Sequence, residues 1–235
     1  AYAARAGMHA TIVVPSHVPL TKLTQIRAYG AKLLQVKGTY TDALKKTWEM
    51  AERDDSLALT GDYPLRMEGQ KTIGFELVDQ LQNEKIENVI CPIGNGTLIV
   101  ALHAAFTQLV EENQLKKLPR LIGVQAANCA PLADAWKKKT LQFVPVKHPH
   151  TIAGAIECGT PVYGVETLLA VNASNGKIVK VSDKEIARAR LDLARKEGLY
   201  TENAGAAVYA AAQDSSLKGT TCAILGGHGL KEPAA

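Results

Sequence analysis

One turn in the sequence has residue types and spacing that suit phosphate binding: Gly94-Asn95-Gly96-Thr97. It follows an apolar, strand-like run and leads directly into a helical pattern that begins at Leu98. Glycines let the main chain approach a ligand closely, and the unpaired N–H groups at a helix start favour an anion. We therefore predict a phosphate site, with an ordinary tight turn as the alternative. The pattern is neither a P-loop nor a GxGxxG fingerprint.

Three further segments are candidates for binding a ligand. Arg66 precedes the helical pattern from Glu68, and its guanidinium can bind a phosphate or carboxylate with two hydrogen bonds; a solvated arginine is the alternative. The segment Tyr200–Ala207 places a polar pair beside small residues, which permit close packing against a ring or another main chain. The turn Gly226–Lys231 has three glycines within four residues, which implies close main-chain approach; His228 alone is more often structural than catalytic.

Composition excludes several other classes of protein. The formal charge is +4, with 46% hydrophobic and 21% charged residues, which is ordinary for a soluble globular protein. No apolar run approaches the length of a membrane span, and because residues 1–10 lack a long apolar segment we expect no signal peptide there. The only basic run, Lys137–Lys139, is typical of a solvated helix end. We expect a cytoplasmic protein with no membrane or nucleic-acid partner.

The cysteines and histidines indicate neither a metal site nor a nucleophile. The four cysteines form no CxxC pair and no HExxH is present, so a zinc site is not expected: Cys91, Cys129, Cys158 and Cys222. So few cysteines in a chain this long also argue against a disulfide framework and for a reducing compartment. No GxSxG occurs, and no cysteine lies in an electropositive setting.

The elements that must position these residues alternate between short apolar strands and amphipathic helices. Strands are predicted at 11–14, 33–36, 57–59, 89–93, 121–125, 178–181 and 221–225. Helices are predicted at 1–6, 19–29, from a cap at Thr41, 68–82, from Leu98, 131–138, from about Val162, 183–196 behind a capping box of Ser182 and Glu185, and 204–213. This order predicts an α/β protein of parallel sheets covered by helices on both faces, with a smaller lobe over 1–60 and a larger lobe over 61–235 that carries the phosphate turn.

The first residues have the pattern of the middle of a helix. Ala1 is not a methionine, and no N-cap residue precedes the run from Ala1 to Ala6. We expect further residues upstream of this sequence.

Taken in order, these segments resemble the pyridoxal-phosphate enzymes of the tryptophan synthase β-like fold (fold type II), and threonine synthases most closely. The resemblance covers nearly the whole chain. Its segments are Ala1–Gly7 with Thr11–Pro15, Tyr29–Lys32, Arg66–Thr72, Gly94–Leu98, Pro119–Ala126, Thr151–Ala153, Gly198–Ala207 and Gly226–Lys231. The runs EGQKT and GHGLK are fairly specific to threonine synthases and their near relatives.

The resemblance implies a role for each matching site residue. The phosphate of pyridoxal 5'-phosphate would lie on Gly94, Asn95, Gly96, Thr97 and Leu98. Gly226 and Gly227 would lie beside the pyridine nitrogen. Arg66 and Asn95 would bind the phosphate of the substrate. The lysine that forms the Schiff base would lie upstream of Ala1, so none of the present lysines is given that role.

The implied reaction is the conversion of O-phospho-L-homoserine and water to L-threonine and phosphate, by a homodimer. Some positions depart from the usual threonine synthase pattern: Gly226 replaces a threonine, Tyr63 an asparagine, and Asn203 and Gly205 a proline and a serine. Two alternatives therefore stay open. One is a related enzyme for another amino acid, such as a cysteate-forming β-replacement or an ammonia-lyase. The other is a catalytically inactive, anion-binding fragment.

Overall fold

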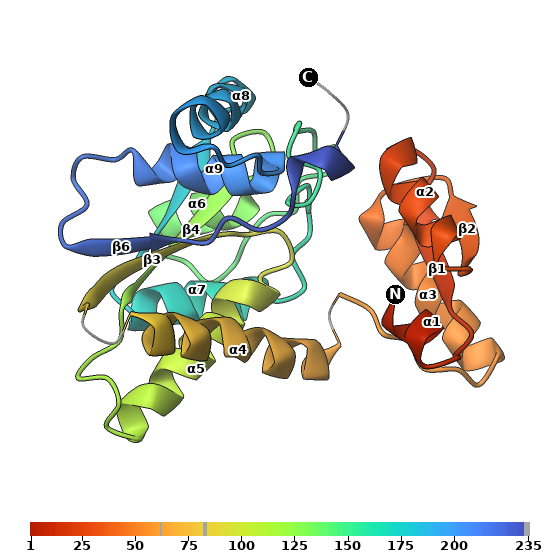
Figure 1. Ribbon diagram of the computed structural model, residues 1–235, viewed down its shortest axis with the longest axis horizontal. Coiled ribbons are helices and arrows are strands. Elements are labelled where there is room, and N and C mark those ends of the chain that lie inside the picture. Colours follow the sequence, from red (N-terminus) through yellow and green to blue (C-terminus); the bar gives the residue numbers. More distant parts are fainter. Residues whose placement is uncertain (62, 82–83, 233–235) are drawn as a thin grey trace. The chain divides into compact units, whose positions relative to one another are not determined.

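The computed structural model describes residues 1–61, 63–81 and 84–232, and the chain divides into two units. The first unit comprises Ala1–Thr60 with the residues from Leu230 onward, and the second comprises Gly61–Gly229 (Figure 1). Both are built from parallel strands and helices, so the predicted α/β class is confirmed.

The first unit is a parallel pair of strands with three helices. β1 pairs with β2 from Thr11↔Lys32 to Pro15↔Val36. The elements are α1 (Tyr2–Arg5), β1 (Thr11–Pro15), α2 (Leu20–Ala28), β2 (Lys32–Val36) and α3 (Tyr40–Arg53). Gly7 and Gly30 follow helices with φ of 67° and 73°, the left-handed conformation that glycine adopts at a helix end.

Two predictions for this unit are wrong. Residues 57–59 form no strand, because they pair with no described strand and the side chains of Leu57 and Leu59 are exposed. The cap of α3 is Thr39 and not Thr41: the Thr39 N–H donates to Asp42 Oδ2 at 2.7 Å in a capping box. A capping box needs an acidic residue three positions on, which Thr39 has and Thr41 lacks.

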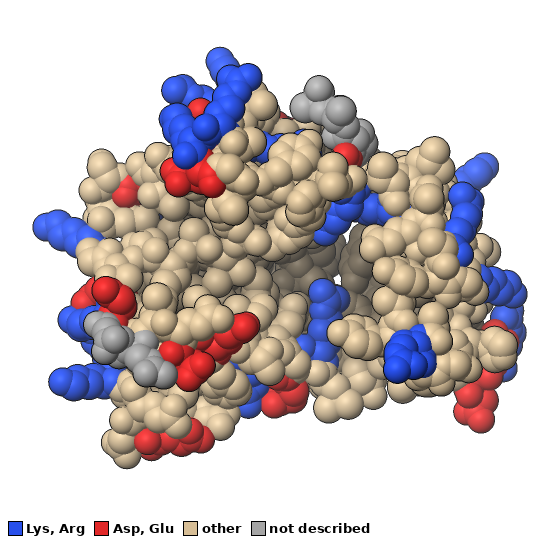
Figure 2. Space-filling model, viewed as in Figure 1, with Lys and Arg blue, Asp and Glu red and all other residues tan. Residues whose placement is uncertain are grey.

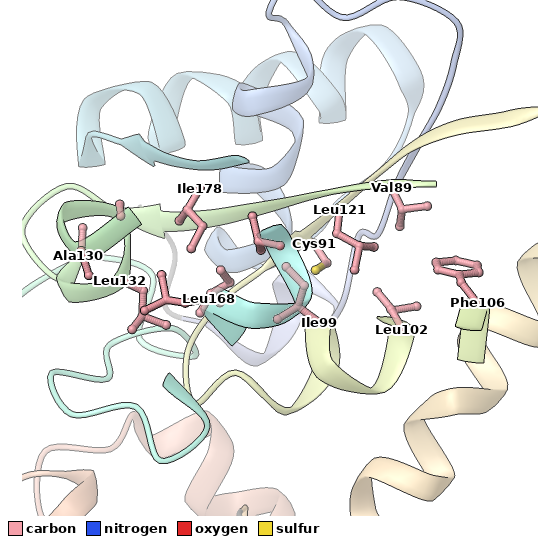
Figure 3. Close-up of a cluster of buried hydrophobic side chains, with 14 of the residues drawn as sticks. Val89, Cys91, Ile99, Leu102, Phe106, Leu121, Ala130, Leu132, Leu168 and Ile178 are labelled. Carbon is pink, nitrogen blue, oxygen red and sulfur yellow. The ribbon is translucent and has the colours of Figure 1, made fainter. Parts of the chain in front are cut away.

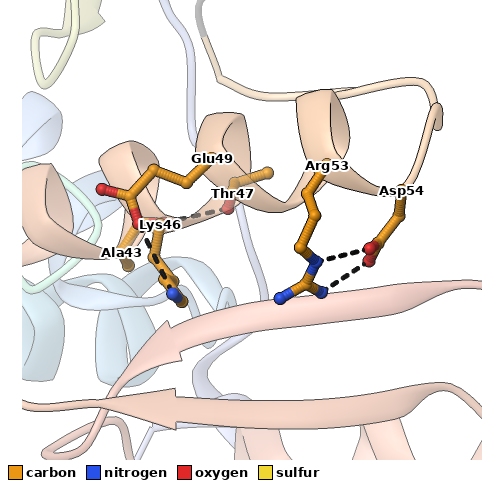
Figure 4. A network of polar contacts seen from close by, with 6 residues as sticks. All are labelled: Ala43, Lys46, Thr47, Glu49, Arg53 and Asp54. Carbon is orange, nitrogen blue, oxygen red and sulfur yellow. Dashed lines mark hydrogen bonds and ion pairs between the residues drawn. The ribbon is translucent and has the colours of Figure 1, made fainter.

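Helix α3 carries short-range polar contacts (Figure 4). The Thr47 hydroxyl donates to the Ala43 carbonyl at 2.9 Å, and Lys46 pairs with Glu49 at 3.4 Å. Arg53 and Asp54 form a two-bond pair at 2.6 and 2.8 Å. These charges are solvent-exposed, and exposed pairs contribute about 0–1 kcal/mol each. The polar contacts of α3 therefore add little to the stability of the unit.

The second unit contains a four-stranded parallel sheet of order β5-β4-β3-β6. Its strands are β3 (Ile86–Pro92), β4 (Arg120–Ala126), β5 (Lys177–Val181) and β6 (Thr220–Ala223). Its helices are α4 (Pro64–Gln80), α5 (Thr97–Glu111), α6 (Pro131–Lys137), α7 (Gly164–Ala173), α8 (Asp183–Asp192) and α9 (Asn203–Ala212). From β3 the chain steps to β4 and β5 on one side and returns as β6 on the other. Because all four strands are parallel, the carboxyl ends of β3 and β6 are neighbours at one edge of the sheet.

Successive residues of β3 point to opposite faces and enter two different cores. Val89 and Cys91 join a core with Leu102 and Phe106 of α5, drawn in Figure 3. Ile90 joins a second core with Ile186 of α8 and with the small residues of α9. Figure 1 shows α8 and α9 on one side of the sheet and α4, α5 and α7 on the other. The predicted covering of both faces is therefore confirmed.

Element boundaries in this unit shift by a few residues from the predictions. The helix predicted at 68–82 begins at Pro64, so Arg66 lies within its first turn; Gln82, its predicted end, lies outside the described residues. The capping box of Ser182 and Glu185 is confirmed, with the Ser182 N–H donating to Glu185 Oε2 at 2.8 Å. Helix α8 is followed by a wider π turn that ends at Gly198 with φ of 68°.

Two surface properties bear on the predicted partners. Over the described residues, no helix combines the length and the apolar character that crossing a membrane requires. Figure 2 shows basic and acidic side chains interspersed over the visible face.

The turn after α9 is fastened to β5 by Asp214, which makes the stability of the fold sensitive to acid. Asp214 accepts from Lys177 Nζ at 2.6 Å and from the Ser216 N–H at 2.9 Å. The hydrogen bond from Lys177 is the main cause that lowers the pKa of Asp214 well below its ordinary value. A carboxyl with a lowered folded-state pKa contributes stability above its unfolded pKa and loses it as the pH falls.

We therefore expect Asp214→Asn to reduce the free energy of unfolding more at about pH 6 than at about pH 2.5. Urea unfolding of both proteins at the two pH values measures the difference. An equal effect at both would show that the charge of Asp214 does not matter.

Candidate functional site

The passage from β3 to α5 is a tight turn that leaves main-chain donors free. Gly96 is the N-cap of α5 and has a left-handed φ of 94°. No side chain caps this helix. The N–H groups of residues 94–98 have no acceptor within the described part of the chain. Free N–H groups at the positive end of a 15-residue helix suit an anion, which is the kind of ligand that the sequence analysis predicts for this turn.

Neighbouring atoms leave no room for side chains at two positions of this turn. A Cβ on Gly94 would lie 3.1 Å from the Ala155 carbonyl oxygen. A Cβ on Gly96 would overlap the Thr167 hydroxyl and come within 2.8 Å of the Tyr163 carbonyl oxygen. The structure thus requires glycine at Gly96 for conformation and for space.

The two polar side chains of the turn are largely enclosed by protein. Thr97 is 6% exposed. Asn95 Oδ1 accepts the Val162 N–H at 2.8 Å and lies 3.8 Å from Cys158 Sγ. Asn95 Nδ2 is buried and has no partner among the described residues. The Asn95 side chain is thus directed at protein, while the main-chain amides of residues 94–98 stay without an acceptor among the described residues.

The glycine loop after β6 lies beside this turn. Pairing of β6 with β3 continues past the strand, where the Ile224 N–H donates to the Ile90 carbonyl at 2.9 Å. Gly226 follows two residues later, and a Cβ there would meet no atom within 4 Å. The loop therefore offers open space at the same edge of the sheet as the phosphate turn.

The candidate segment Tyr200–Ala207 packs against this glycine loop. The Glu202 N–H donates to the Gly227 carbonyl at 3.2 Å, and the Thr201 hydroxyl donates to the same oxygen at 3.1 Å. A Cβ on Gly205 would overlap the Thr201 hydroxyl. Two segments that the sequence shows separately thus form one wall of the site.

Arg190 holds this wall together, and sequence reasoning missed it. The side chain is 5% exposed and donates to the carbonyls of Thr201 and Gly229, both at 3.2 Å, and to Tyr200 Oη at 3.0 Å. Its guanidinium also lies over the Tyr200 ring, 4.9 Å from the centroid. A signal was present: Arg190 stands four residues after the buried Ile186, where a helix face pattern calls for an apolar residue.

Helices α4 and α5 run in the same direction, which decides where Arg66 lies. Gly74 packs on Ala105, where a Cβ would overlap the alanine methyl. Residues from the C-terminal parts of both helices line one surface hollow, Val78 from α4 and Leu109 from α5. Figure 1 shows both helices beginning at the same end of the unit.

Arg66 therefore lies at about the level of the phosphate turn. Arg66 is eight residues before Gly74, and Thr97 is eight before Ala105. At 1.5 Å per residue, both lie about 12 Å from the helix contact, toward the same end. Arg66 is exposed and forms no ion pair with a described carboxylate. The end of the unit thus presents a free guanidinium and free amides.

Other reactive side chains give no second candidate. Burial raises the pKa of the Cys91 thiol to about 12 and that of Cys158 to about 11, so neither is a thiolate nucleophile at neutral pH. Burial lowers the pKa of His103. The described residues contain no group of histidine, cysteine and acidic side chains that could hold a metal ion.

Comparison with protein families gives one match over almost the whole chain. Residues 1–227 match the family model described as pyridoxal-phosphate dependent enzyme. The chain is 38% identical over 242 residues to threonine synthase of Methanocaldococcus jannaschii, covering all of this chain and 60% of that protein. It is 37% identical to threonine synthase of Synechocystis, covering 99% and 60%. The chain thus spans about three fifths of these relatives.

Solved structures of several enzymes share the fold. Threonine deaminase isoform 2 of Solanum lycopersicum superposes with a TM-score of 0.77 at 23% identity, covering 95% of this chain and 64% of the other. An L-serine ammonia-lyase of Rhizomucor miehei gives 0.79 at 21%, covering 96% and 72%. At these identities the likeness establishes the fold alone.

The turn geometry makes Gly96→Ala a severe change. The left-handed φ and the overlap with Thr167 together should cost about 2–4 kcal/mol of unfolding free energy. We also expect weaker binding of inorganic phosphate, because the amides shift. Urea unfolding and phosphate titration measure the two effects.

A matched control is Gly69→Ala, on an exposed helical position where a Cβ meets nothing within 4 Å. It should stabilise the protein by about 0.5–1 kcal/mol. Equal effects of the two changes would contradict the geometry of the turn.

Proposed function

The chain belongs to the family of pyridoxal-phosphate dependent enzymes, and from this premise we propose that it forms part of a threonine synthase-like lyase. The reaction is the conversion of O-phospho-L-homoserine and water to L-threonine and phosphate. Support comes from the family match, from relatives named threonine synthase at 35–38% identity over essentially the whole chain, and from an end of the second unit suited to two phosphate groups.

The cofactor phosphate binds the main-chain amides of residues 94–98. These amides fit the group because they are free donors at a helix start and because Gly94 and Gly96 leave the main chain bare. Gly226 and Gly227, in the loop after the neighbouring strand β6, would flank the ring, and the open space beside Gly226 fits such a group. When bound, the cofactor supplies an electron sink for carbanions of the substrate.

Arg66 binds and orients the phosphate of the substrate, and this position is the single observation that carries the choice of substrate. A guanidinium without an ion pair among the described residues stands level with the cofactor's phosphate turn. Arginine binds phosphate through two parallel hydrogen bonds, which fixes both position and orientation. A substrate with its own phosphate uses this second anion site, whereas an unphosphorylated amino acid does not.

Two wider properties belong to the same proposal. Members of this group of enzymes are expected to be homodimers, and we propose the same for the protein that contains this chain. The four cysteines are all free thiols. Because free thiols are typical of a reducing compartment, we propose that the protein is cytoplasmic.

We expect Arg66→Gln to raise the KM for O-phospho-L-homoserine about 10- to 100-fold, because a charge-assisted hydrogen bond is lost. The assay uses the full-length protein, meaning this chain with its natural flanking residues. Arg188→Gln, a change of an arginine whose side chain is 85% exposed on α8, is the control and should leave the KM unchanged.

The same assay decides between substrates. Phosphate release and threonine formation from O-phospho-L-homoserine support the proposal. Inactivity on that compound together with turnover of phosphoserine or threonine would reject it in favour of a related β-replacement or ammonia-lyase reaction.

A further inference from the structure

The phosphate turn rests on one continuous stretch of chain, residues 155–167, here called the backing segment. Gly94 lies against the Ala155 carbonyl, and Gly96 lies against the Tyr163 carbonyl and the Thr167 hydroxyl. Between them, the Asn95 carbonyl accepts the Tyr163 N–H at 3.1 Å. Three consecutive residues of the turn are thus supported from one side.

The side chain of Asn95 provides the polar bond of this support. Its Oδ1 accepts the Val162 N–H at 2.8 Å, and the Cys158 thiol donates weakly to the same oxygen at 3.8 Å. Its Nδ2 is covered by protein and meets no described partner. The oxygen and the nitrogen of the Asn95 side chain therefore both face protein. A side chain that binds substrate would instead expose one of these atoms.

We propose that Asn95 is a positioning residue for the cofactor phosphate, and not the substrate ligand that the resemblance implies. Its side-chain oxygen fastens the turn to the backing segment, so that the amides of the turn stay aimed at the anion. The inference rests on the proposed cofactor site and does not depend on which amino acid the enzyme converts.

The physical reason is preorganisation of the donors. Main-chain amides bind an anion well only when they already point at it, because ordering a loose turn consumes binding free energy. Without the oxygen of Asn95, the Val162 N–H loses its acceptor and the turn loses its hydrogen bond to the backing segment. Asn95 would act on the phosphate alone, because the residues that would flank the cofactor ring, Gly226 and Gly227, belong to the separate loop after β6.

This difference gives a test that separates positioning from substrate binding. In the full-length protein, Asn95→Ala should lower the affinity for pyridoxal 5'-phosphate about five- to thirtyfold and leave the affinity for pyridoxal, which lacks the phosphate, unchanged. At saturating cofactor, the KM for whichever amino acid the enzyme turns over should stay the same. Asn172→Ala, an exposed asparagine on α7, is the matched control and should change neither quantity.

A second variant tests the same proposal even if Asn95→Ala fails to fold. Cys158→Ala removes the weak donor to Asn95, together with the sulfur that accepts from the Thr160 main chain, and should lower the affinity for pyridoxal 5'-phosphate about two- to threefold. In the Asn95→Ala background the same change should have no further effect, because both act through one oxygen.

Three outcomes would overturn the proposal. One is an unchanged cofactor affinity with a raised KM for a phosphorylated substrate, which makes Asn95 a substrate ligand. Another is an equal loss for pyridoxal and its phosphate, which places the effect outside the phosphate turn. The third is full additivity of the Cys158 and Asn95 changes. Inactivity on O-phospho-L-homoserine alone would reject the proposed substrate and leave this comparison intact.

Discussion

The arrangement of the helices and loops at the candidate site depends on the turn by which the chain leaves β3. At the end of β3 the main chain must turn directly into α5, and it does so through Gly96 with φ of 94° in a space that holds no side chain. The helix start that results points free amides beyond the sheet edge. The same turn fixes the direction of α5, and through the close contact of Gly74 with Ala105 it fixes the level of α4. This chain of contacts places Arg66 at about the level of the turn.

Close packing on both faces of the sheet keeps that turn in register. Ile93, the residue before the turn, packs against the main chain of the neighbouring strand β4 at Gly123. A Cβ on Gly123 would overlap the Ile93 side chain, so this contact requires glycine. On the other face the small residues of α9 bring the glycine loop after β6 close to the sheet edge. The site is thus assembled from loops whose positions are decided by side chains that never touch a ligand. This explains why bare glycines recur at its edge.

Polar groups buried around the site stiffen it from behind. Arg190 joins the wall of Thr201 and Gly229, and Asn95 joins the turn to residues 158–163. A buried guanidinium is stabilising only when its donors are satisfied, and here main-chain carbonyls and a tyrosine hydroxyl supply the acceptors. Both residues act on main-chain segments, so their contribution is to the precision of the site.

The sequence by itself determined the α/β class, the order of most elements, the glycine turn into α5 and the capping box at Ser182, because these follow from local periodicity, glycine conformation and short-range hydrogen bonds. It did not decide that residues 57–59 lack a partner strand, since pairing depends on what lies beside them in space. Nor did it show that Arg190 hydrogen-bonds the carbonyls of Thr201 and Gly229, or that the Asn95 side chain faces residues 158–163. Those contacts join segments far apart in the chain, and only tertiary packing brings them within hydrogen-bond reach.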